Sequence, residues 1–280
     1  MAETLSSLGF TREEIHKCEA AGDGRIVVNA TIAGEPARLL LDTTQRIDLS
    51  LSLGYVRQRG WPYTRRDESW GTSPLTDFAA LGRSRPHDPV SVEGREDDPK
   101  AYYTVGKIGT QLVGDALLAI DPVEWTVGVS RRAEVRDCFA RATHRLVLLP
   151  NILDNLPLTN ALADSRAPEH RPVFMLDTEH PSSVLSLEFT EHCWSSTWRR
   201  WSARRACRRD GTLTVSWSLP AGGTAALDMR IVAACTPRYP MPLGADTVHG
   251  YLGLDFLYRW LPLFDFPGRQ LALFDFAAVP

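Results

Sequence analysis

The stretch "FMLDTEHPSS", residues 174–183, decides the fold of this chain. It begins with an apolar run, which predicts a buried strand, and the run ends at Asp177 and Thr178. A strand that ends this way carries a carboxyl group and a hydroxyl group into a loop, where functional residues concentrate. The next residue, Glu179, adds another carboxyl group. The stretch therefore predicts either an acid–base loop with an extra carboxylate or a catalytic loop that has lost its function.

The first half of the chain contains a second copy of this pattern. Residues 37–53, "ARLLLDTTQRIDLSLSL", match the sequence around Asp177 in order and residue type. In each half, two apolar residues and a Gly follow at a similar distance. Gly114 comes 72 residues after Asp42, and Gly253 comes 76 residues after Asp177. Because order, type and spacing agree in both halves, the sequence predicts an internal duplication.

The bulk composition is that of an ordinary globular protein. The chain has 280 residues, 44% apolar and 23% charged, which is enough for a large core and one or two domains. The net charge of -3 provides no overall attraction for nucleic acid. Only three of the 31 basic residues are lysines, a skew that indicates a GC-rich genome.

The cysteines and the apolar runs bear on the compartment. Five cysteines without a CxxC pair argue against a disulfide framework and a zinc site, and suit a reducing compartment. The first residues lack the pattern of a signal peptide, and no apolar run reaches about 18 residues. We therefore expect a soluble cytoplasmic protein that does not enter a membrane.

The sequence divides into four parts. These are an N-terminal helical segment (1–24), an N-terminal lobe (25–130), a linker (131–160) and a C-terminal lobe (161–280). Thr11 and Glu14 have the spacing of a capping box, which predicts a short helix over residues 9–20. Two apolar runs around "AGEP" (33–36) predict a β-hairpin, and residues 131–145 in the linker predict a helix.

With this layout, the chain resembles the two-lobed aspartic proteases, pepsin-like in being one chain and retropepsin-like in its compact lobes. The resemblance spans residues 25–275 in layout, although the matching motifs are short. It implies an all-β, duplicated two-lobed β-barrel fold with a few short helices. In that family each lobe supplies one Asp from an Asp-Thr/Ser-Gly loop, braced by a strand that ends in two apolar residues and a Gly. Carried over to this sequence, the resemblance implies that Asp42 and Asp177 are the catalytic residues. It implies that the hydroxyls of Thr43 and Thr178 join the two loops. It also implies two sets of bracing residues, one in the first lobe (Leu112, Val113 and Gly114) and one in the second (Tyr251, Leu252 and Gly253).

The chemistry of such a site depends on the two carboxyl groups being close. Two carboxylates about 3 Å apart cannot both ionise cheaply, so they share one proton. The ionised group can take a proton from water, and the protonated group can polarise a carbonyl. Because the two pKa values belong to the pair, neither role is assigned to Asp42 or to Asp177 alone.

Both loops depart from the family pattern at their third position. Thr44 and Glu179 stand where the family has Gly, so both loop shapes can differ from those of the family. An inward Glu179 would put three carboxyl groups in the site and raise the pKa of at least one, whereas an outward Glu179 would bond a backbone N–H or an arginine. The family also covers its cleft with an aromatic-bearing hairpin, for which Trp61, Tyr63 and Trp70 are the candidates.

Three further features have a functional and a structural interpretation. His180 is either a base or pH switch, or a solvated loop residue, which is the commoner role of a loop His beside a Pro. Asp246 and His249 precede the second bracing strand and carry the same alternatives. Residues 194–210 combine Trp at helical spacing with many Arg, either as a surface for a partner or nucleic acid or as a helix that packs on the second lobe. The net charge favours packing.

Three hypotheses for the function follow. The first is an aspartic endopeptidase that works near neutral pH and binds an extended peptide between the lobes. The second is a repurposed acid–base enzyme that cyclises, dehydrates or isomerises a small molecule, for example in bacterial natural-product biosynthesis. The third is a non-catalytic binding protein in which Thr44 or Glu179 fills the place of the water.

Cofactor motifs do not contribute to these hypotheses. The chain contains no GxGxxG, HExxH or GxSxG pattern, so we expect neither a cofactor nor a metal. The expected partner is a peptide or small-molecule substrate in the cleft between the lobes, and neither nucleic acid nor membrane is expected.

Overall fold

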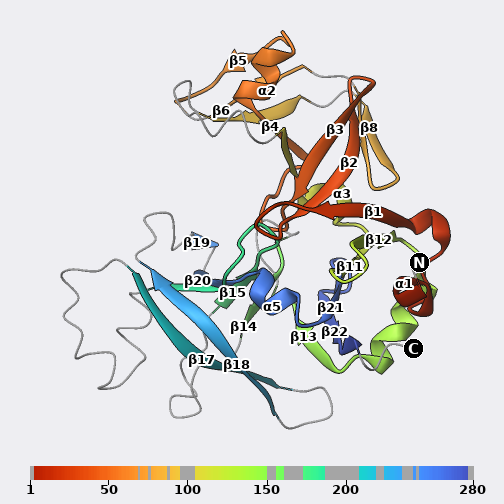
Figure 1. Cartoon of the computed structure of the whole chain (residues 1–280), viewed down its shortest axis with the longest axis vertical. Coiled ribbons are helices and arrows are strands. Elements are labelled where there is room, and N and C mark those ends of the chain that lie inside the picture. The colour runs from red at the N-terminus through yellow and green to blue at the C-terminus, as the bar shows by residue number, and fades with distance from the viewer. Residues whose placement is uncertain are drawn as a thin grey trace.

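The computed structural model describes residues 3–68, 70–74, 77–86, 89–94, 105–149, 156–160, 173–186, 208–218, 224–234, 242–243 and 246–276. These residues are mostly in strands, with a few short helices between them (Figure 1). The prediction of an all-β protein is confirmed at this level. In the described ranges, no helix has the length and apolar character needed to cross a membrane.

The strands of the described residues form two sheets. The larger sheet has 15 strands: β1 (Ile15–Ala20), β2 (Ile26–Ile32), β3 (Glu35–Leu41), β4 (Leu49–Ser52), β5 (Thr64–Arg65), β6 (Trp70–Ser73), β7 (Asp77–Ala80), β8 (Arg83–Pro86), β9 (Val90–Glu93), β10 (Gly106–Ile108), β11 (Leu117–Asp121), β12 (Thr126–Ser130), β13 (His144–Val147), β21 (Leu261–Asp265) and β22 (Gln270–Phe274). The smaller sheet has seven: β14 (Leu158–Asn160), β15 (Val173–Leu176), β16 (Val184–Ser186), β17 (Arg208–Ser218), β18 (Thr224–Ala234), β19 (Pro242–Leu243) and β20 (Asp246–Leu252).

The helices of the described residues are short. They are α1 (Glu3–Ser7), the 3₁₀ helix η1 (Arg12–Glu14), α2 (Leu53–Gln58), α3 (Thr110–Val113), the 3₁₀ helix η3 (Ala133–Arg141) and α5 (Leu254–Leu257). The helix expected in the linker is found as η3, which buries Val135, Cys138 and Phe139. Two of these helices, α3 and α5, directly follow strands that enter the candidate site.

The hairpin of β2 and β3 shows how the local sequence sets the sheet. Ile26, Val28 and Ile32 of β2 are buried at the even spacing of a strand with one face on the core. The expected turn follows β2, where Ala33 and Gly34 both have positive φ, at 50° and 79°. Glycine allows this conformation without steric cost, so the chain reverses here and β3 returns beside β2.

Two sequence predictions about architecture are wrong. Residues 9–20 are not a helix: only η1 forms, and the chain continues as strand β1. The Thr11 amide does donate to the Glu14 carboxylate at 2.9 Å, but β1 then pairs with β12 on one side and β2 on the other, which satisfies its backbone better than a short exposed helix would. The β-barrel is also not found, because the described strands form open sheets, the larger ending at β13 and β5.

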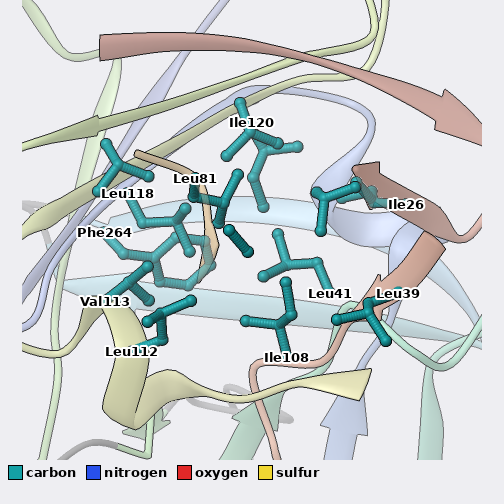
Figure 2. Close-up of a cluster of buried hydrophobic side chains, with 14 of the residues drawn as sticks. Ile26, Leu39, Leu41, Leu81, Ile108, Leu112, Val113, Leu118, Ile120 and Phe264 are labelled. Atoms are coloured by element: carbon teal, nitrogen blue, oxygen red, sulfur yellow. The ribbon is translucent and has the colours of Figure 1, made fainter. Parts of the chain in front are cut away.

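The main core connects the two halves of the chain. Figure 2 shows Ile26, Leu41 and Ile108 packed in one cluster with Leu118 and Phe264. Phe264 comes from β21, near the end of the described chain, and is fully buried. Burying a side chain of this size stabilises the fold by about 1.5–3 kcal/mol. The first half of the sequence therefore depends on the second half to fill its core.

The sheet pairing has the same consequence. Strand β21 pairs antiparallel with β11, opposite Leu117 and Leu118, and β22 pairs with β13 (Figure 1). Residues 261–274, assigned to the C-terminal lobe from sequence, thus lie in the larger sheet with strands of the N-terminal half. The chain passes from the larger to the smaller sheet between β13 and β14, within residues 131–160, and returns to the larger sheet at β21.

Candidate active site at the two Asp-Thr loops

The two Asp-Thr loops are held by the same arrangement of strands. In the first half, β3 lies parallel to β10, which is antiparallel to β4, and the Asp42 amide donates to the Ile108 carbonyl at 2.9 Å. In the second half, β15 lies parallel to β20, which is antiparallel to β16, and the Asp177 amide donates to the Leu252 carbonyl at 2.9 Å. Each aspartate is therefore fixed by a central strand that arrives from far along the sequence.

This arrangement corrects one of the predicted bracing glycines. Gly253 follows Leu252 as the sequence pattern predicts, but the equivalent residue in the first half is Gly109, which follows Ile108. Gly114 instead ends helix α3, with Leu112 and Val113 inside that helix. A Cβ on Gly109 would overlap the carbonyl oxygens of Ile47 and Gln45, and one on Gly253 would overlap those of His180 and Ser182. Only glycine therefore fits where each loop crosses its central strand.

The loops are joined by their threonines. The Thr43 amide donates to the Thr178 hydroxyl at 3.0 Å, and the Thr178 amide donates to the Thr43 hydroxyl at 3.2 Å. The Thr43 hydroxyl in turn donates to the Leu176 carbonyl at 2.7 Å, and the Thr178 hydroxyl to the Leu41 carbonyl at 2.6 Å. Both threonines are fully buried. The structure thus brings the two aspartate-bearing loops together through four reciprocal hydrogen bonds.

Asp42 lies in a site that stabilises its charge. Its Oδ1 accepts hydrogen bonds from the Thr44 amide at 2.8 Å and the Thr44 hydroxyl at 2.6 Å. Its Oδ2 lies 3.3 Å from Nζ of Lys107, which comes from β10. Burial alone would raise the pKa of Asp42, but the Lys107 ammonium and the Thr44 hydrogen bonds outweigh it and lower the pKa below its ordinary value. Thr44, at the position of the family glycine, therefore acts as a donor to the carboxylate.

Glu179 points into the site, as the first of its two alternatives predicted. Its Oε2 lies 2.6 Å from Lys107 Nζ, and its Oε1 lies 3.6 Å from an Arg25 guanidinium nitrogen. Burial raises the pKa of Glu179, the nearby charge of Asp42 raises it further, and Lys107 only partly opposes this. When protonated, Glu179 hydrogen-bonds to Asp42 and helps to lower the pKa of Asp42. Asp42 and Glu179, from different loops, are thus a carboxyl pair whose pKa values are shifted in opposite directions.

Asp177 forms the other half of the site with His180. Its Oδ1 accepts hydrogen bonds from the Glu179 amide at 2.7 Å and the His180 amide at 3.1 Å. Its Oδ2 lies 2.7 Å from Nδ1 of His180. The His180 ring stacks on Tyr251, with centroids 5.2 Å apart and planes 9° from parallel. The hydrogen bond to Asp177 raises the pKa of His180, and burial opposes this only in part. The imidazole is therefore fixed in position, and the contact with Asp177 stabilises the imidazolium that forms when the ring takes up a proton.

The remaining sequence candidates lie elsewhere. Trp61 packs edge-on against Tyr55 and Tyr63 is partly buried against the core, so both have packing roles. Trp70 is 42% exposed and lines a cavity of about 420 Å³ in the first half, together with Ile47, Leu49, Phe78, Val90 and Gln111. Of the three flap candidates, Trp70 is thus placed beside a cavity of the described residues.

His249 and Asp246 both lie in strand β20 of the smaller sheet. His249 accepts a hydrogen bond from the Val173 amide at Nδ1, at 3.0 Å, which gives it a structural role in the smaller sheet. Asp246 begins β20. Most of the Trp- and Arg-rich stretch 194–210 lies outside the described residues, and its last three residues belong to β17.

Lys107 and Arg25 are functional candidates that sequence reasoning missed. Lys107 lies in a short strand where a polar residue normally faces solvent, and only the parallel pairing of β10 with β3 brings it beside Asp42. The available signal was its place directly before Ile108 and Gly109, the same position that Tyr251 has before Leu252 and Gly253. Within the described residues, no group of three or more His, Cys, Asp or Glu side chains is arranged to hold a metal ion.

Comparison of the chain with protein-family models and with curated proteins finds no match.

Proposed function

We propose that this chain is an enzyme that uses Asp42 and Asp177 for acid–base chemistry, on a duplicated two-lobed scaffold similar to that of the aspartic proteases, and that it hydrolyses peptide bonds. The observation that carries the proposal is the reciprocal hydrogen bonding of Thr43 and Thr178. It brings together two Asp-Thr loops of the same construction, one from each half of the chain. A pair of unrelated turns would have no reason to share these bonds.

The charges of the site support acid–base chemistry. Against the effect of burial, Lys107 lowers the pKa of Asp42, whereas burial raises the pKa of Glu179 beside it. Of the two carboxyl groups, Asp42 therefore releases its proton more readily and Glu179 keeps its proton more readily, so that the first suits a base and the second an acid. Lys107 also supplies a positive charge 3.3 Å from Asp42, which would stabilise an oxyanion that forms beside it.

A second candidate is acid–base chemistry on a small molecule. It is favoured by Lys107 and His180, which contact the Oδ2 atoms of Asp42 and Asp177. In peptide hydrolysis by a proton-sharing dyad, such oxygens would hold the attacking water. Cations in those positions suit the binding of a compact anionic substrate, whose reaction would be a cyclisation, dehydration or isomerisation.

The test combines a peptide library with an inhibitor. The protein is incubated with a degenerate peptide library from pH 4 to 8, and products are identified by mass spectrometry. We expect cleavage that falls by at least about 100-fold in Asp42→Asn and Asp177→Asn, the range for losing an acid–base group. The exposed Asp77 provides the control variant Asp77→Asn, which should retain full activity.

Thermal stabilisation by a statine-containing peptide separates the alternatives. Its hydroxyl replaces the attacking water, so stabilisation should depend on both aspartates. Stabilisation that persists in Asp42→Asn, without any cleavage, would indicate a binding protein. Neither cleavage nor stabilisation of a folded protein would overturn peptide hydrolysis and leave the small-molecule reaction.

A further inference from the structure

We propose that His180 is the group that exchanges protons with the attacking water, and that Asp177 acts as the positioning residue that orients it. This inference rests on the proposed function and refines it: Asp177 takes part in the acid–base chemistry through His180, and does not itself exchange a proton with the water. It differs from a two-carboxylate mechanism in its base, which is an imidazole held by one of the aspartates.

Both oxygens of the Asp177 carboxylate already have hydrogen-bond partners. The side chain of Asp177 is only 2% exposed. Two backbone amides fill Oδ1, and the His180 ring occupies Oδ2. The charge of Asp177 is therefore separated from an incoming water by the imidazole, whose side chain is 49% exposed.

The contact with Asp177 fixes the tautomer of His180. An ionised carboxylate only accepts hydrogen bonds, so the contact with Asp177 Oδ2 requires a hydrogen on Nδ1. In the neutral ring, Nε2 then carries the free lone pair. The part of the chain that the structure describes supplies no hydrogen bond to Nε2. The contact with Asp177 thus leaves Nε2 as the basic atom of the ring.

The His180 ring is held in place by two contacts. Tyr251 of β20 stacks on the imidazole of His180. The hydrogen bond to Asp177 then fixes how the imidazole is rotated within the plane of its ring. Tyr251 directly precedes Leu252, whose carbonyl holds the Asp177 amide. The same strand therefore positions both the carboxylate and the ring that it orients, as a preorganised base requires.

The charged groups around His180 all act in one direction. Asp177 and Glu179 come from its own loop, and Asp42 comes from the opposite loop. Each of these carboxyl groups stabilises the imidazolium when it is ionised. Lys107 contacts two of them, Glu179 and Asp42. The imidazole can thus accept a proton without leaving an isolated positive charge.

The proposed reaction is hydrolysis of a peptide bond by one water molecule. A water donates one proton to Nε2 of His180, and its oxygen forms a bond to the carbonyl carbon of the substrate. The carbonyl π pair moves to the oxygen beside Lys107, which gives a tetrahedral oxyanion. The oxyanion then re-forms the carbonyl, the C–N bond breaks, and the leaving nitrogen takes the proton from Nε2. The products are one carboxylic acid and one amine, and His180 returns to its neutral form.

The first arm of the test does not depend on activity. Ring-nitrogen NMR on histidine-labelled protein, assigned by loss of a signal in His180→Gln, reports the tautomer and the pKa of His180. We expect the hydrogen of the neutral ring on Nδ1, and a pKa that falls in Asp177→Asn. A hydrogen on Nε2 would overturn the proposal, and so would a pKa that Asp177→Asn leaves unchanged. If Asp177→Asn does not fold, the tautomer in the unaltered protein decides.

The second arm uses the peptide cleavage assay. We expect His180→Gln to lower kcat by at least about 100-fold and to abolish the rise of rate with pH that a neutral imidazole base produces. Full activity with an unchanged pH profile in His180→Gln would overturn this inference and leave the proposed hydrolysis standing. Absence of cleavage in the unaltered protein would instead sink the proposed hydrolysis, and the NMR arm would still decide the role of His180.

Discussion

The amide of Thr43 donates a hydrogen bond to the hydroxyl of Thr178, and the amide of Thr178 donates one to the hydroxyl of Thr43. Each hydroxyl also donates to the carbonyl that precedes the aspartate of the opposite loop. All of these groups are buried, so the loops cannot separate without leaving several of them unsatisfied. One pair of threonines therefore fixes the positions of both Asp42 and Asp177.

Replacing one of these hydroxyls should weaken the whole protein. Thr178→Val keeps the side-chain shape but leaves the Thr43 amide and the Leu41 carbonyl unsatisfied, at about 1–3 kcal/mol for each buried group. Urea denaturation would measure the loss, and Thr178→Ser, which keeps the hydroxyl, is the matched control. The double variant with Thr43→Val should cost less than the sum of the two single variants. Strict additivity would show that the two hydroxyls act independently.

Removing Lys107 should destabilise the protein and shift its acid unfolding. Lys107→Met leaves Asp42 and Glu179 without their shared cation, and we expect a loss of about 1–3 kcal/mol at neutral pH, because the ammonium is only partly buried. Asp42 stabilises the fold above its unfolded pKa of about 3.9, and this contribution is lost as pH falls through its lowered folded pKa. Without Lys107 that loss should begin at higher pH. Lys17→Met, at an exposed site, is the control and should change neither quantity.

Glu179 should make the protein less stable as the pH rises. Its folded pKa lies above the ordinary value of 4.5, so the folded state holds a proton that the unfolded state has released. Stability therefore falls as pH rises from 4.5 through the folded pKa. We expect Glu179→Gln to remove this fall of stability with pH. At pH values above the folded pKa of Glu179, the variant should be more stable than the unaltered protein. Denaturation at a series of pH values would measure both effects. Glu134→Gln, at an exposed position, is the control and should keep the fall of stability with pH. If Glu179→Gln also kept it unchanged, the inward placement of the Glu179 carboxyl group would be contradicted.

His180 should add a second pH-dependent contribution to the stability of the fold, at higher pH than that of Glu179. Its folded pKa is raised, so the stability that it provides is fully present below its unfolded pKa of about 6.5 and is lost as pH rises through the folded value. His180→Gln should flatten the stability curve in this range. Asp177→Asn should flatten it as well, because the hydrogen bond to Asp177 is the main cause of the shift. A slope that survives in His180→Gln would have to come from another group.

Gly109→Ala should be costly, because its Cβ would overlap the carbonyl oxygens of Ile47 and Gln45. We expect a loss of about 1–3 kcal/mol, the usual range for overpacking a tight site. Gly22→Ala is the matched control, since a Cβ there meets no atom within 4 Å. Thermal unfolding of both variants would measure the difference. Equal stabilities would argue against Gly109 as the glycine that meets the Asp42 loop.

The Asp-Thr loops are predictable from sequence because their signal is local. An apolar run that ends at Asp177 or Asp42 has the character of a buried strand followed by a polar loop, and the structure places a strand and a loop there. The helix over residues 9–20 fails for the complementary reason. Its spacing favours a helix, but pairing of β1 with two distant strands overrides that local preference.

The rest of the site depends on contacts that no local pattern encodes. Lys107 reaches Asp42 only because β10 runs parallel to β3, a pairing that sequence periodicity does not reveal. The sequence leaves Glu179 with an inward and an outward alternative, and the choice depends on Lys107 and Arg25. The pattern of two apolar residues before a Gly favours Gly114 over Gly109, because one of the two residues before Gly109 is a lysine.

The late strands β21 and β22 set the order of events when the protein is made. The ribosome releases the partners of these strands, β11 and β13, long before β21 and β22 emerge. The Tyr258 hydroxyl likewise donates to the carbonyl of Gly24, 234 residues earlier in the chain. The N-terminal half must therefore wait with part of its apolar surface uncovered until residues 261–274 arrive. Folding of this protein is expected to finish only after translation of that segment, and chaperones that bind apolar surface would have their main opportunity in this interval.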